Sequence, residues 1–416
     1  MRILHVNKFL YRRGGAEAYM LDLAALQRAR GDEVAFFGMQ HPDNDPQPYA
    51  ASFPSRVEFE PPPASFTGKA RAAARMFWSS SAARGIDTVL ADFDPDVVHL
   101  HNIYHHLSPS ILRPIAARRI PAVMTLHDYK LACPTYQFLD KGELCQACLG
   151  GHFSQAPRRR CKGGSLGASA LAAAELSLHT RLHAYATIGR FVCPSQFMAD
   201  TMASAGVFPD RLRHVPHFAD IAGVVPGDAP GRGIAVACRL SHEKGIDVVI
   251  DAVGRLGMDT TLDIAGEGPE RGALEERAAA VAPGRVTFHG RLPGADVQRL
   301  LRGAVLACVP SRWYENQPMI VLEALACGTP VVASDLGGAG ELVTPGGDGA
   351  LVPANDPSAL AAAMAPLLDD PSAARAMGLR GRAKVQVAFA PDRHLANLDA
   401  VYGEATDMVG RAKVGS

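Results

Sequence analysis

The sequence has few cysteines, no net charge and no long apolar run, and each absence excludes a class of protein. Eight cysteines in 416 residues are too few for a scaffold built on disulfides. Lys and Arg together number 42, as do Asp and Glu, so no overall field favours nucleic acid as a partner. No run reaches the about 18 apolar residues of a spanning helix, and residues 1–6 are too short and too quickly polar for a signal peptide. We therefore expect a cytoplasmic protein.

Short β-branched runs alternate with helical stretches along the chain, in two successive sets. Such alternation is typical of βαβ units and predicts parallel sheets flanked by helices. The first set has expected strands at 2–6, 33–38, 97–101 and 122–126. The second set restarts with a strand at 233–238, after a stretch rich in proline and glycine, 215–232, that is typical of a linker.

The two sets predict an α/β fold of two Rossmann-like, doubly wound parallel-sheet domains that face a central cleft. Residues 1–215 would form the first domain, with a cysteine-rich insertion at 130–165, and residues 216–390 the second. A last helical stretch within 391–416 would cross back to the first domain, with frayed final residues, 409–416. Ligands of such sheets bind beyond the carboxyl ends of the strands, so the active site is expected between the halves.

Two motifs at strand ends have the chemistry of anion binding. Gly14 and Gly15 lie between the first strand and its helix, where glycines let a ligand approach the N–H groups of the helix start. Arg239 and Lys244 follow the first strand of the second set, and a guanidinium fork with an ammonium suits a diphosphate. The alternatives are an ordinary glycine turn and a solvated surface turn.

Two glutamates, Glu315 and Glu323, make the most informative stretch of the sequence. Glu315 stands in a loop, and Glu323 lies in an apolar helix that begins near Pro318. A carboxylate embedded among apolar residues is costly to bury without a partner. A vicinal diol such as a ribose would satisfy Glu323, and Glu315 would then lie near the other end of the same ligand.

With these motifs the chain resembles the retaining glycosyltransferases of family 4, which have the GT-B fold. The resemblance spans nearly the whole chain and is most specific in its second half. It is carried by Gly14-Gly15, Arg239 with Lys244-Gly245, Gly266-Glu267-Gly268-Pro269, Gly290-Arg291-Leu292-Pro293, Pro310-Ser311, the pair Glu315 and Glu323, and Gly328-Thr329-Pro330.

The resemblance implies a role for each matching residue. Arg239 and Lys244 would bind the donor diphosphate, and Glu323 the nucleotide ribose. Glu315 would hold hydroxyls of the donor sugar, and His127, at the end of a strand in the first half, would face the transferred sugar. Arg239, Lys244, Glu315 and His127 are thus the expected catalytic set, and fixed cations near the leaving group supply electrostatic stabilisation.

The rest of the expected donor site is also taken from the resemblance. Gly14 and Gly15 would close over the phosphate and the acceptor, and Gly266 would line the donor site. Asn316 and Gln317 stand where many family members have Gly-Phe-Gly after the first glutamate, so the chain departs from the family pattern there.

The expected reaction is transfer of a sugar from a UDP- or GDP-sugar to a saccharide acceptor, taken to be a lipid-linked or cell-surface polysaccharide intermediate. The resemblance implies retention of anomeric configuration by front-face attack, with no organic cofactor and no catalytic metal. One alternative is a small-molecule acceptor, and another is a non-catalytic module that binds sugar nucleotides.

Four cysteines, Cys133, Cys145, Cys148 and Cys161, lie close together in a loop-like stretch rich in glycine and proline. A C-x2-C pair with two flanking cysteines suits a closed tetrahedral zinc site, which would be structural rather than catalytic. Disulfides or free thiols are the alternatives.

Two further features have competing interpretations. His99 and His101 face one side of a strand, but no nearby carboxylate completes a familiar metal-ligand set, so we expect a buried strand. Basic residues with Met, Phe and Trp at 69–84, and the basic run 158–162, could contact an anionic bilayer at the inner face of the membrane. Solvated helix faces are the alternative.

Overall fold

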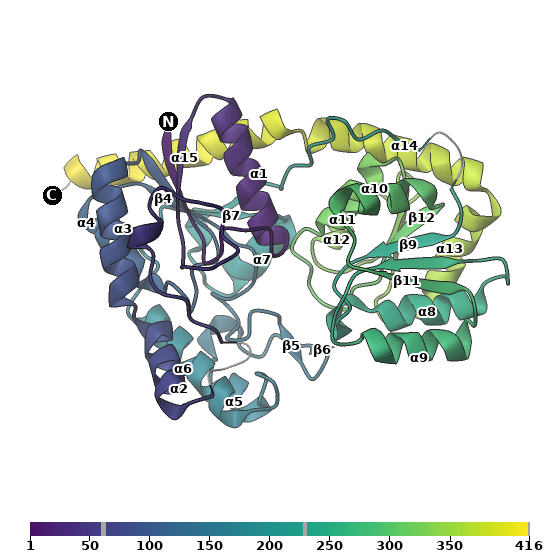
Figure 1. Ribbon diagram of the computed structural model, residues 1–416, viewed down its shortest axis with the longest axis horizontal. Helices are drawn as coiled ribbons and strands as arrows, with labels where there is room; N and C mark the ends of the chain where they lie inside the picture. Colours follow the sequence, from purple (N-terminus) through teal and green to yellow (C-terminus); the bar gives the residue numbers. More distant parts are fainter. Residues whose placement is uncertain (60–63, 228–230, 415–416) are drawn as a thin grey trace.

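The structure is a computed structural model that describes residues 1–59, 64–227 and 231–414. Within these residues it has two six-stranded sheets and one two-stranded hairpin. The two large sheets lie in separate halves of the molecule, and the last two helices run along them, one beside each half (Figure 1). The two doubly wound sheets expected from the alternation of strands and helices are therefore present.

The first sheet is parallel throughout. Across the sheet the strands are β2 (Glu33–Phe37), β1 (Arg2–Val6), β3 (Val97–Leu100), β4 (Ala122–Thr125), β7 (Arg190–Cys193) and β8 (Leu212–His214). Every residue of β3 and β4 is buried, as expected for a parallel sheet covered on both faces. The strand order reverses between β1 and β3, and such a switch point opens a crevice at the carboxyl ends of the strands.

Helices of the first half cover this sheet and carry the insertion. They are α1 (Gly15–Ala29), α2 (Phe66–Phe77), α3 (Ser80–Phe93), α4 (Leu112–Ala117), α5 (Gln155–Arg159), α6 (Leu166–Arg181) and α7 (Gln196–Ser204). Serine side chains accept hydrogen bonds from the first turns of α2, α3, α6 and α7, which satisfies N–H groups that have no partner inside the helix. The insertion also holds the hairpin of β5 (Leu139–Asp140) and β6 (Glu143–Leu144).

The second sheet is also parallel. Across it lie β11 (Val286–Gly290), β10 (Leu262–Ala265), β9 (Ile234–Ala237), β12 (Leu306–Val309), β13 (Val331–Ser334) and β14 (Gly349–Val352). The strand order reverses between β9 and β12, the Rossmann arrangement. Its helices are α8 (Ile246–Arg255), α9 (Arg271–Val281), α10 (Gly294–Gly303), α11 (Met319–Ala326), α12 (Ala339–Leu342), α13 (Pro357–Asp369) and α14 (Pro371–Ala388).

The last helix, α15 (Pro391–Val414), packs on the first sheet although it follows the second in the chain. Its apolar side chains, among them Leu398 and Val401, join a buried cluster with Ile3 and Val123 of the first sheet. The helix continues to Val414, and 415–416 lie outside the described residues. None of the helices in the described ranges has the length and apolar character needed to span a bilayer.

Side chains of the second half also bind the first half directly. The carboxylate of Glu341, on α12, accepts hydrogen bonds from the backbone N–H groups of Gln196 and Phe197, at the start of α7. A carboxylate at this place satisfies helix N–H groups and complements the helix dipole. Ser195 and a carboxylate from the other half of the molecule therefore share the N-terminal cap of α7.

The cysteine-rich insertion also reaches the second half, as Figure 1 shows for the β5–β6 hairpin. An added Cβ on Gly142, in the hairpin turn, would lie 2.4 Å from Nε2 of His242. Beyond the hairpin, Nε2 of Gln146 donates to the hydroxyl of Tyr314 at 3.2 Å. The insertion thus closes one side of the space between the sheets.

Candidate active site

A cavity of about 760 Å³ lies between the two halves. Its lining from the first half includes Gly14, Gly15 and His127, and its lining from the second half includes Arg239 and Lys244. These residues follow the carboxyl ends of β1, β4 and β9, where ligands of open parallel sheets bind. The structure also brings Gly266, Glu315, Asn316, Gln317 and Glu323 to the same cavity.

Gly14 and Gly15 form the exposed start of α1 in this cavity. Packing does not explain why both are glycine: an added Cβ on Gly15 would have no atom within 4 Å, and one on Gly14 would make only an ordinary contact with Glu17. The backbone of Gly14 is extended, with φ −157°. Because glycine has no side chain, the first turn of α1 is open to the cavity, where its N–H groups favour an anion.

The second half places Lys244 at its switch point through a glycine. Gly245 has φ +66°, and an added Cβ there would lie 2.1 Å from the carbonyl oxygen of Pro310. Only glycine allows this approach, which brings the turn that ends at Lys244 against the end of β12.

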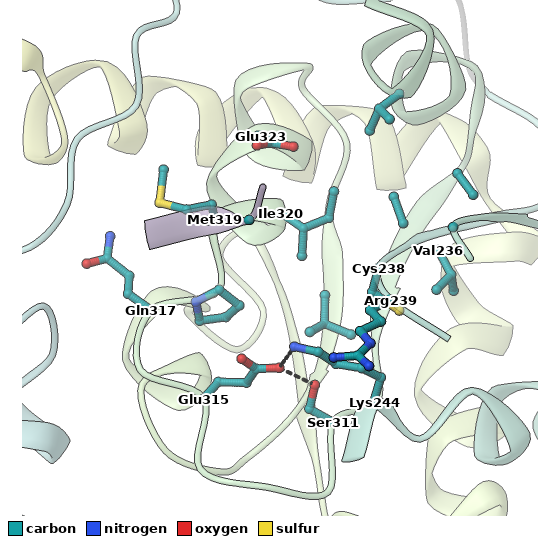
Figure 2. Close-up of a pocket in the computed structure, with 18 of the residues that line it drawn as sticks. Val236, Cys238, Arg239, Lys244, Ser311, Glu315, Gln317, Met319, Ile320 and Glu323 are labelled. Carbon is teal, nitrogen blue, oxygen red and sulfur yellow. Dashed lines mark hydrogen bonds and ion pairs between the residues drawn. The ribbon is translucent and has the colours of Figure 1, made fainter. Parts of the chain in front are cut away.

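Lys244 and Glu315 form an ion pair, with 2.6 Å between Nζ and Oε1. The same carboxylate oxygen accepts from the hydroxyl of Ser311 at 2.7 Å, as Figure 2 shows. Burial alone would lower the pKa of Lys244, but Glu315 outweighs it and raises that pKa. Burial would likewise raise the pKa of Glu315, but Lys244 lowers it. Both groups are charged, and the sequence did not indicate that they pair.

Arg239 is an exposed cation of this cavity, as are Arg13 and Arg291. Among the described residues its guanidinium has no recorded hydrogen bond or carboxylate partner, in contrast with Lys244. Figure 2 places it beside Lys244 on the same wall. A guanidinium without a protein counter-charge is suited to bind an anionic ligand in two-point fashion.

Glu323 differs from the sequence expectation of a buried carboxylate. Its side chain is exposed to the cavity, whereas Val321, Leu322 and Ala324, on the same helix, are fully buried. The neighbours Val321, Leu322 and Ala324 pack into the core of the second half, and α11 turns Glu323 to the cleft. Desolvation by the cleft walls, and then the charge of Asp22, raise the pKa of Glu323.

Asn316 and Gln317 line the cavity and also bind protein, although Oδ1 of Asn316 has no hydrogen-bond partner among the described residues. The amide of Asn316 donates to the backbone carbonyl of His127. Gln317 accepts from the backbone N–H of His217 at 2.7 Å and donates to the carbonyl of His217 at 3.1 Å. The loop that departs from the family pattern therefore joins the second half to the first.

Gly266 is explained by packing as well as by its place in the cavity. It follows β10 with φ +149°, and an added Cβ would lie 1.8 Å from the carbonyl oxygen of Cys238. Its backbone therefore packs against the loop that carries Arg239. A direct contact with a donor is not needed to account for this glycine.

His127 enters the cavity from the end of β4 as a neutral imidazole. Burial, and then the charge of Lys8, lower its pKa to about 3. Its Nε2 lies 3.0 Å from Nδ1 of His101, which lies on the loop after β3. His127 is thus backed by other buried histidines, a contact that the sequence did not indicate.

His5, His99 and His101 have ligand atoms within 4.8 Å of one another, the one such group of metal-ligating type among the described residues. All six of their ring nitrogens have hydrogen-bond partners. A metal ion would have to displace several of these bonds. The expectation that His99 and His101 are buried strand-end residues agrees with their complete burial.

The four cysteines of the insertion are not joined by disulfide bonds in the structure. Cys133 and Cys148 are buried, and Cys145 and Cys161 are half-buried. Burial, and then the neighbouring thiols of Cys133, Cys161 and Cys145, raise the pKa of Cys148 to about 12. The four therefore lie near one another, although they do not form a group within 4.8 Å in the part of the chain that the structure describes.

Two family models match the chain. The model described as Glycosyltransferase Family 4 matches residues 13–222, and the model described as Glycosyl transferases group 1 matches residues 231–384. The two matches are consecutive, and the first covers half of the chain.

Curated relatives agree with these models. The chain is 30% identical over 310 residues to a GDP-mannose-dependent alpha-(1-6)-phosphatidylinositol monomannoside mannosyltransferase of Mycolicibacterium smegmatis, covering 67% of this chain and 78% of the relative. It is 39% identical over 155 residues to a glycogen synthase of Mycobacterium tuberculosis, covering 36% of this chain and 37% of the relative. Against several curated relatives the chain spans only 37% to 56% of their length.

Solved structures share the fold along the whole chain. Sucrose-phosphate synthase from Thermosynechococcus elongatus superimposes with a TM-score of 0.69 at 19% identity, covering 100% of this chain and 99% of the other. Anabaena Alr3699/HepE, solved in complex with UDP, gives a TM-score of 0.67 at 19% identity, covering 99% and 100%. At this identity the likeness shows the fold alone. With both family models and the arrangement of the two sheets, it confirms the resemblance: the chain belongs to glycosyltransferase family 4 and has the GT-B fold.

Proposed function

We propose that the protein is a retaining glycosyltransferase that moves a sugar from a nucleoside-diphosphate donor to a saccharide acceptor. One observation carries the proposal: the exposed Arg239 and the paired Lys244 share a cavity with the open start of α1 and with His127. Two cations on one wall and helix N–H groups on another suit a diphosphate between them.

The cations would act on the leaving group. When the bond between the anomeric carbon and the diphosphate breaks, the electron pair goes to the phosphate oxygen, and negative charge develops there. Arg239 and Lys244 are fixed in a partly enclosed cavity, where oriented charges stabilise a transition state more than they do in water. Glu315, which is ionised, would accept hydrogen bonds from hydroxyls of the donor sugar while it keeps Lys244 in place.

Glu323 would bind the nucleotide ribose. It lies on the far side of Met319 and Ile320 from Glu315 (Figure 2), so a ligand that reaches both glutamates extends along this wall. An exposed carboxylate can accept from both hydroxyls of a diol. The base remains open between uracil and guanine: one structural neighbour was solved with UDP, and one relative is named as GDP-mannose-dependent.

For the acceptor we propose a lipid-linked or cell-surface saccharide. Relatives named for phosphatidylinositol mannosides and for the lipopolysaccharide core support this class. In this proposal residues 1–215 bind the acceptor, residues 216–390 bind the donor, and 391–416 tie the halves together. Retention by front-face attack rests on the family alone.

Thermal unfolding with UDP, GDP and their sugar conjugates tests the proposal. A nucleotide that binds only the folded chain adds about 2.7 kcal/mol of stability at a hundred times its Kd, which raises Tm by several degrees. We expect one base to give this shift and its sugar conjugate to be consumed with an acceptor. No shift with any of them contradicts the proposal, whereas a shift without turnover would favour a non-catalytic binding module.

We also propose that the four cysteines of the insertion hold a structural zinc ion. Thiolates in a C-x2-C pair with two flanking cysteines are a suitable tetrahedral set, and binding would draw the four sulfurs together. Metal analysis of protein purified without chelator should find about one zinc per chain, lost in Cys148→Ser and kept in the matched control Cys308→Ser. A metal-free parent protein would overturn the assignment.

Finally, we propose that the face formed by α2, α5 and α6 contacts an anionic bilayer. These helices pack together. Lys69, Arg71 and Arg158 are exposed on them, and Trp78, which follows α2, and Leu166, at the start of α6, are exposed as well. Basic and apolar side chains on one face suit a charged lipid surface. The protein should sediment with vesicles of phosphatidylcholine and phosphatidylglycerol. A smaller fraction of the Trp78→Ser variant should sediment with them. Equal recovery with phosphatidylcholine alone contradicts a charge-driven contact.

A further inference from the structure

Buried polar side chains connect the cavity to the linker between the two sheets. The connection begins at the carbonyl oxygen of Pro216 and ends at His127, and its members come from four separate segments of the first half and from α15. In order they are Pro216, His394, Tyr19, Thr125, His99, Tyr402, Gln27, His5, His101 and His127.

The linker end of this chain of hydrogen bonds has a fixed direction. The carbonyl of Pro216 can only accept, so Nδ1 of His394, 2.7 Å away, carries the proton. Nε2 of a neutral His394 must then accept from the hydroxyl of Tyr19 at 2.9 Å. The hydroxyl of Tyr19 has only one proton, which it donates to His394. Thr125 must therefore be the donor in the hydrogen bond between Tyr19 and Thr125. The oxygen of Thr125 therefore accepts from Nε2 of His99, at 2.7 Å.

The direction continues through α15 and α1. Because Nε2 of His99 carries the proton, its Nδ1 accepts from the hydroxyl of Tyr402 at 2.8 Å. Tyr402 has then used its proton, so it accepts from the amide nitrogen of Gln27 at 3.2 Å. The amide is thereby oriented, and its oxygen accepts from Nε2 of His5 at 2.7 Å.

The last two bonds reach the cavity. Nδ1 of His5 accepts from Nε2 of His101 at 3.1 Å, and Nδ1 of His101 accepts from Nε2 of His127 at 3.0 Å. His127 therefore carries its proton on Nε2. Nδ1 remains as the acceptor nitrogen of a ring that lines the cavity.

We infer that this chain of hydrogen bonds sets the tautomer of His127, so that Nδ1 accepts a hydrogen bond from a hydroxyl of the bound sugar. The inference rests on the proposed function for the identity of the ligand, but not for the tautomer. Gln27, His5 and His101 are then positioning residues, because they act on the ligand only through His127.

The charge state of the histidines supports one direction for the whole chain. Burial lowers the pKa of His5 to about 4 and that of His394 to about 4, and burial also lowers the pKa values of His99 and His101. Neutral rings have one donor and one acceptor each, so no member can donate at both nitrogens. The competing interpretation is a metal ion bound by His5, His99 and His101, which would break the chain of hydrogen bonds.

Nitrogen NMR of the full-length protein, labelled in its histidines, tests the tautomer without any turnover. We expect His127 to be protonated at Nε2 only, with the same spectrum after treatment with a chelator. Gln27→Leu removes the link to Tyr402 and should give His127 in both tautomers, with kcat/KM lowered about tenfold. Gln27→Glu keeps an oxygen opposite His5 and should keep the Nε2 tautomer.

Met20→Leu is the control, since Met20 is buried on the same helix as Gln27 but is not a member of the chain of hydrogen bonds. It should leave both the spectrum and kcat/KM unchanged. Protonation at Nδ1 in the parent protein, an unchanged tautomer in Gln27→Leu, or a spectrum altered by the chelator overturns the inference. A correct tautomer in a protein that transfers no sugar contradicts the proposed function and leaves the tautomer assignment intact.

Discussion

The two halves of the molecule build their sides of the cavity in different ways. In the second half the cavity residues lie a few positions apart: Arg239 and Lys244 follow one strand, and Glu315 and Glu323 follow another. In the first half His127 depends on partners as distant in sequence as Gln27 and Tyr402, whose own hydrogen bond joins residues 375 positions apart.

This difference shows what kind of site each architecture can make. Charged residues that follow one strand closely give a cation-rich wall, and the turns after that strand are enough to position them. A neutral imidazole with a defined tautomer needs a long buried network, and that network requires α15 to close the sheet. The wall from the second half is therefore built for charge, and the wall from the first half for hydrogen-bond direction.

The largest effect on this comparison should come from removing the guanidinium of Arg239. Arg239→Ala should lower kcat about 100- to 1000-fold, because a fixed donor to the leaving group is lost. Tm should change little, since the guanidinium is exposed and has no recorded partner among the described residues. The transfer assay would be run beside Arg299→Ala, an exposed arginine paired with Asp296 on the surface of the same half. Similar rates for the two variants contradict the role of Arg239.

Acid should destabilise the first half before the second. Burial lowers the pKa of His5, His127 and His394 to about 4, 3 and 4, from 6.5. The unfolded chain therefore binds more protons between about pH 6.5 and 4, and stability falls as the pH falls through this window, by about 2 kcal/mol for each of these histidines down to pH 5.

The two tryptophans, Trp78 and Trp313, allow this prediction to be checked half by half. Trp313→Phe leaves a reporter in the first half, and Trp78→Phe leaves one in the second. Urea unfolding at pH 7 and pH 5 should move the Trp78 midpoint further than the Trp313 midpoint. Equal shifts would mean that the two halves unfold as one unit or share the acid sensitivity.

A smaller effect is expected when the ion pair of the second half is broken. Glu315→Gln leaves Lys244 in a largely enclosed place without its carboxylate, which should cost about 2 kcal/mol of stability. Glu275→Gln, which breaks an exposed pair with Arg271, is the control and should cost less than about 1 kcal/mol. Thermal unfolding of both variants compares them, and equal losses would show that the Lys244 pair is no stronger than a surface pair.

The smallest effect should come from Glu323. Glu323→Gln keeps the side-chain shape but removes the charge that accepts from a diol, so the Kd of the nucleoside diphosphate should rise about tenfold, or about 1.4 kcal/mol. Titration calorimetry would measure this beside Glu276→Gln, an exposed glutamate on α9. An unchanged Kd in Glu323→Gln would remove the ribose contact from the proposal.

The fold was predictable from the sequence where strands are short apolar runs. Expected strands at 2–6 and 122–126 differ from β1 and β4 by at most one residue. Helix α14 was not expected as an element, because its alanine-rich stretch has weak apolar periodicity and its capping residue, Asp370, resembles a loop residue. For the basic stretch 69–84, which α2 and the start of α3 occupy, a solvated helix face was one interpretation, but no bounds were predicted.

The site was predictable where its chemistry is local, and not where it depends on packing. Arg239, Lys244, Glu315 and Glu323 could be grouped from their places in the sequence, since each follows a strand. The exposure of Glu323, the pairing of Lys244 with Glu315, and the engagement of Gln317 with His217 depend on how helices and loops turn toward one another. No sequence signal marks Gln27 or Tyr402 as members of a network that reaches the cavity.

The cap that Glu341 gives to α7 has a consequence for motion. If the halves rotate apart to admit a sugar nucleotide, Gln196 and Phe197 lose their carboxylate acceptor, and two amides must turn to water instead. Opening and closing then become distinct states separated by the making or breaking of a helix terminus. The amide protons of these two residues would exchange with solvent each time the molecule opens, which makes them natural reporters of how often it does.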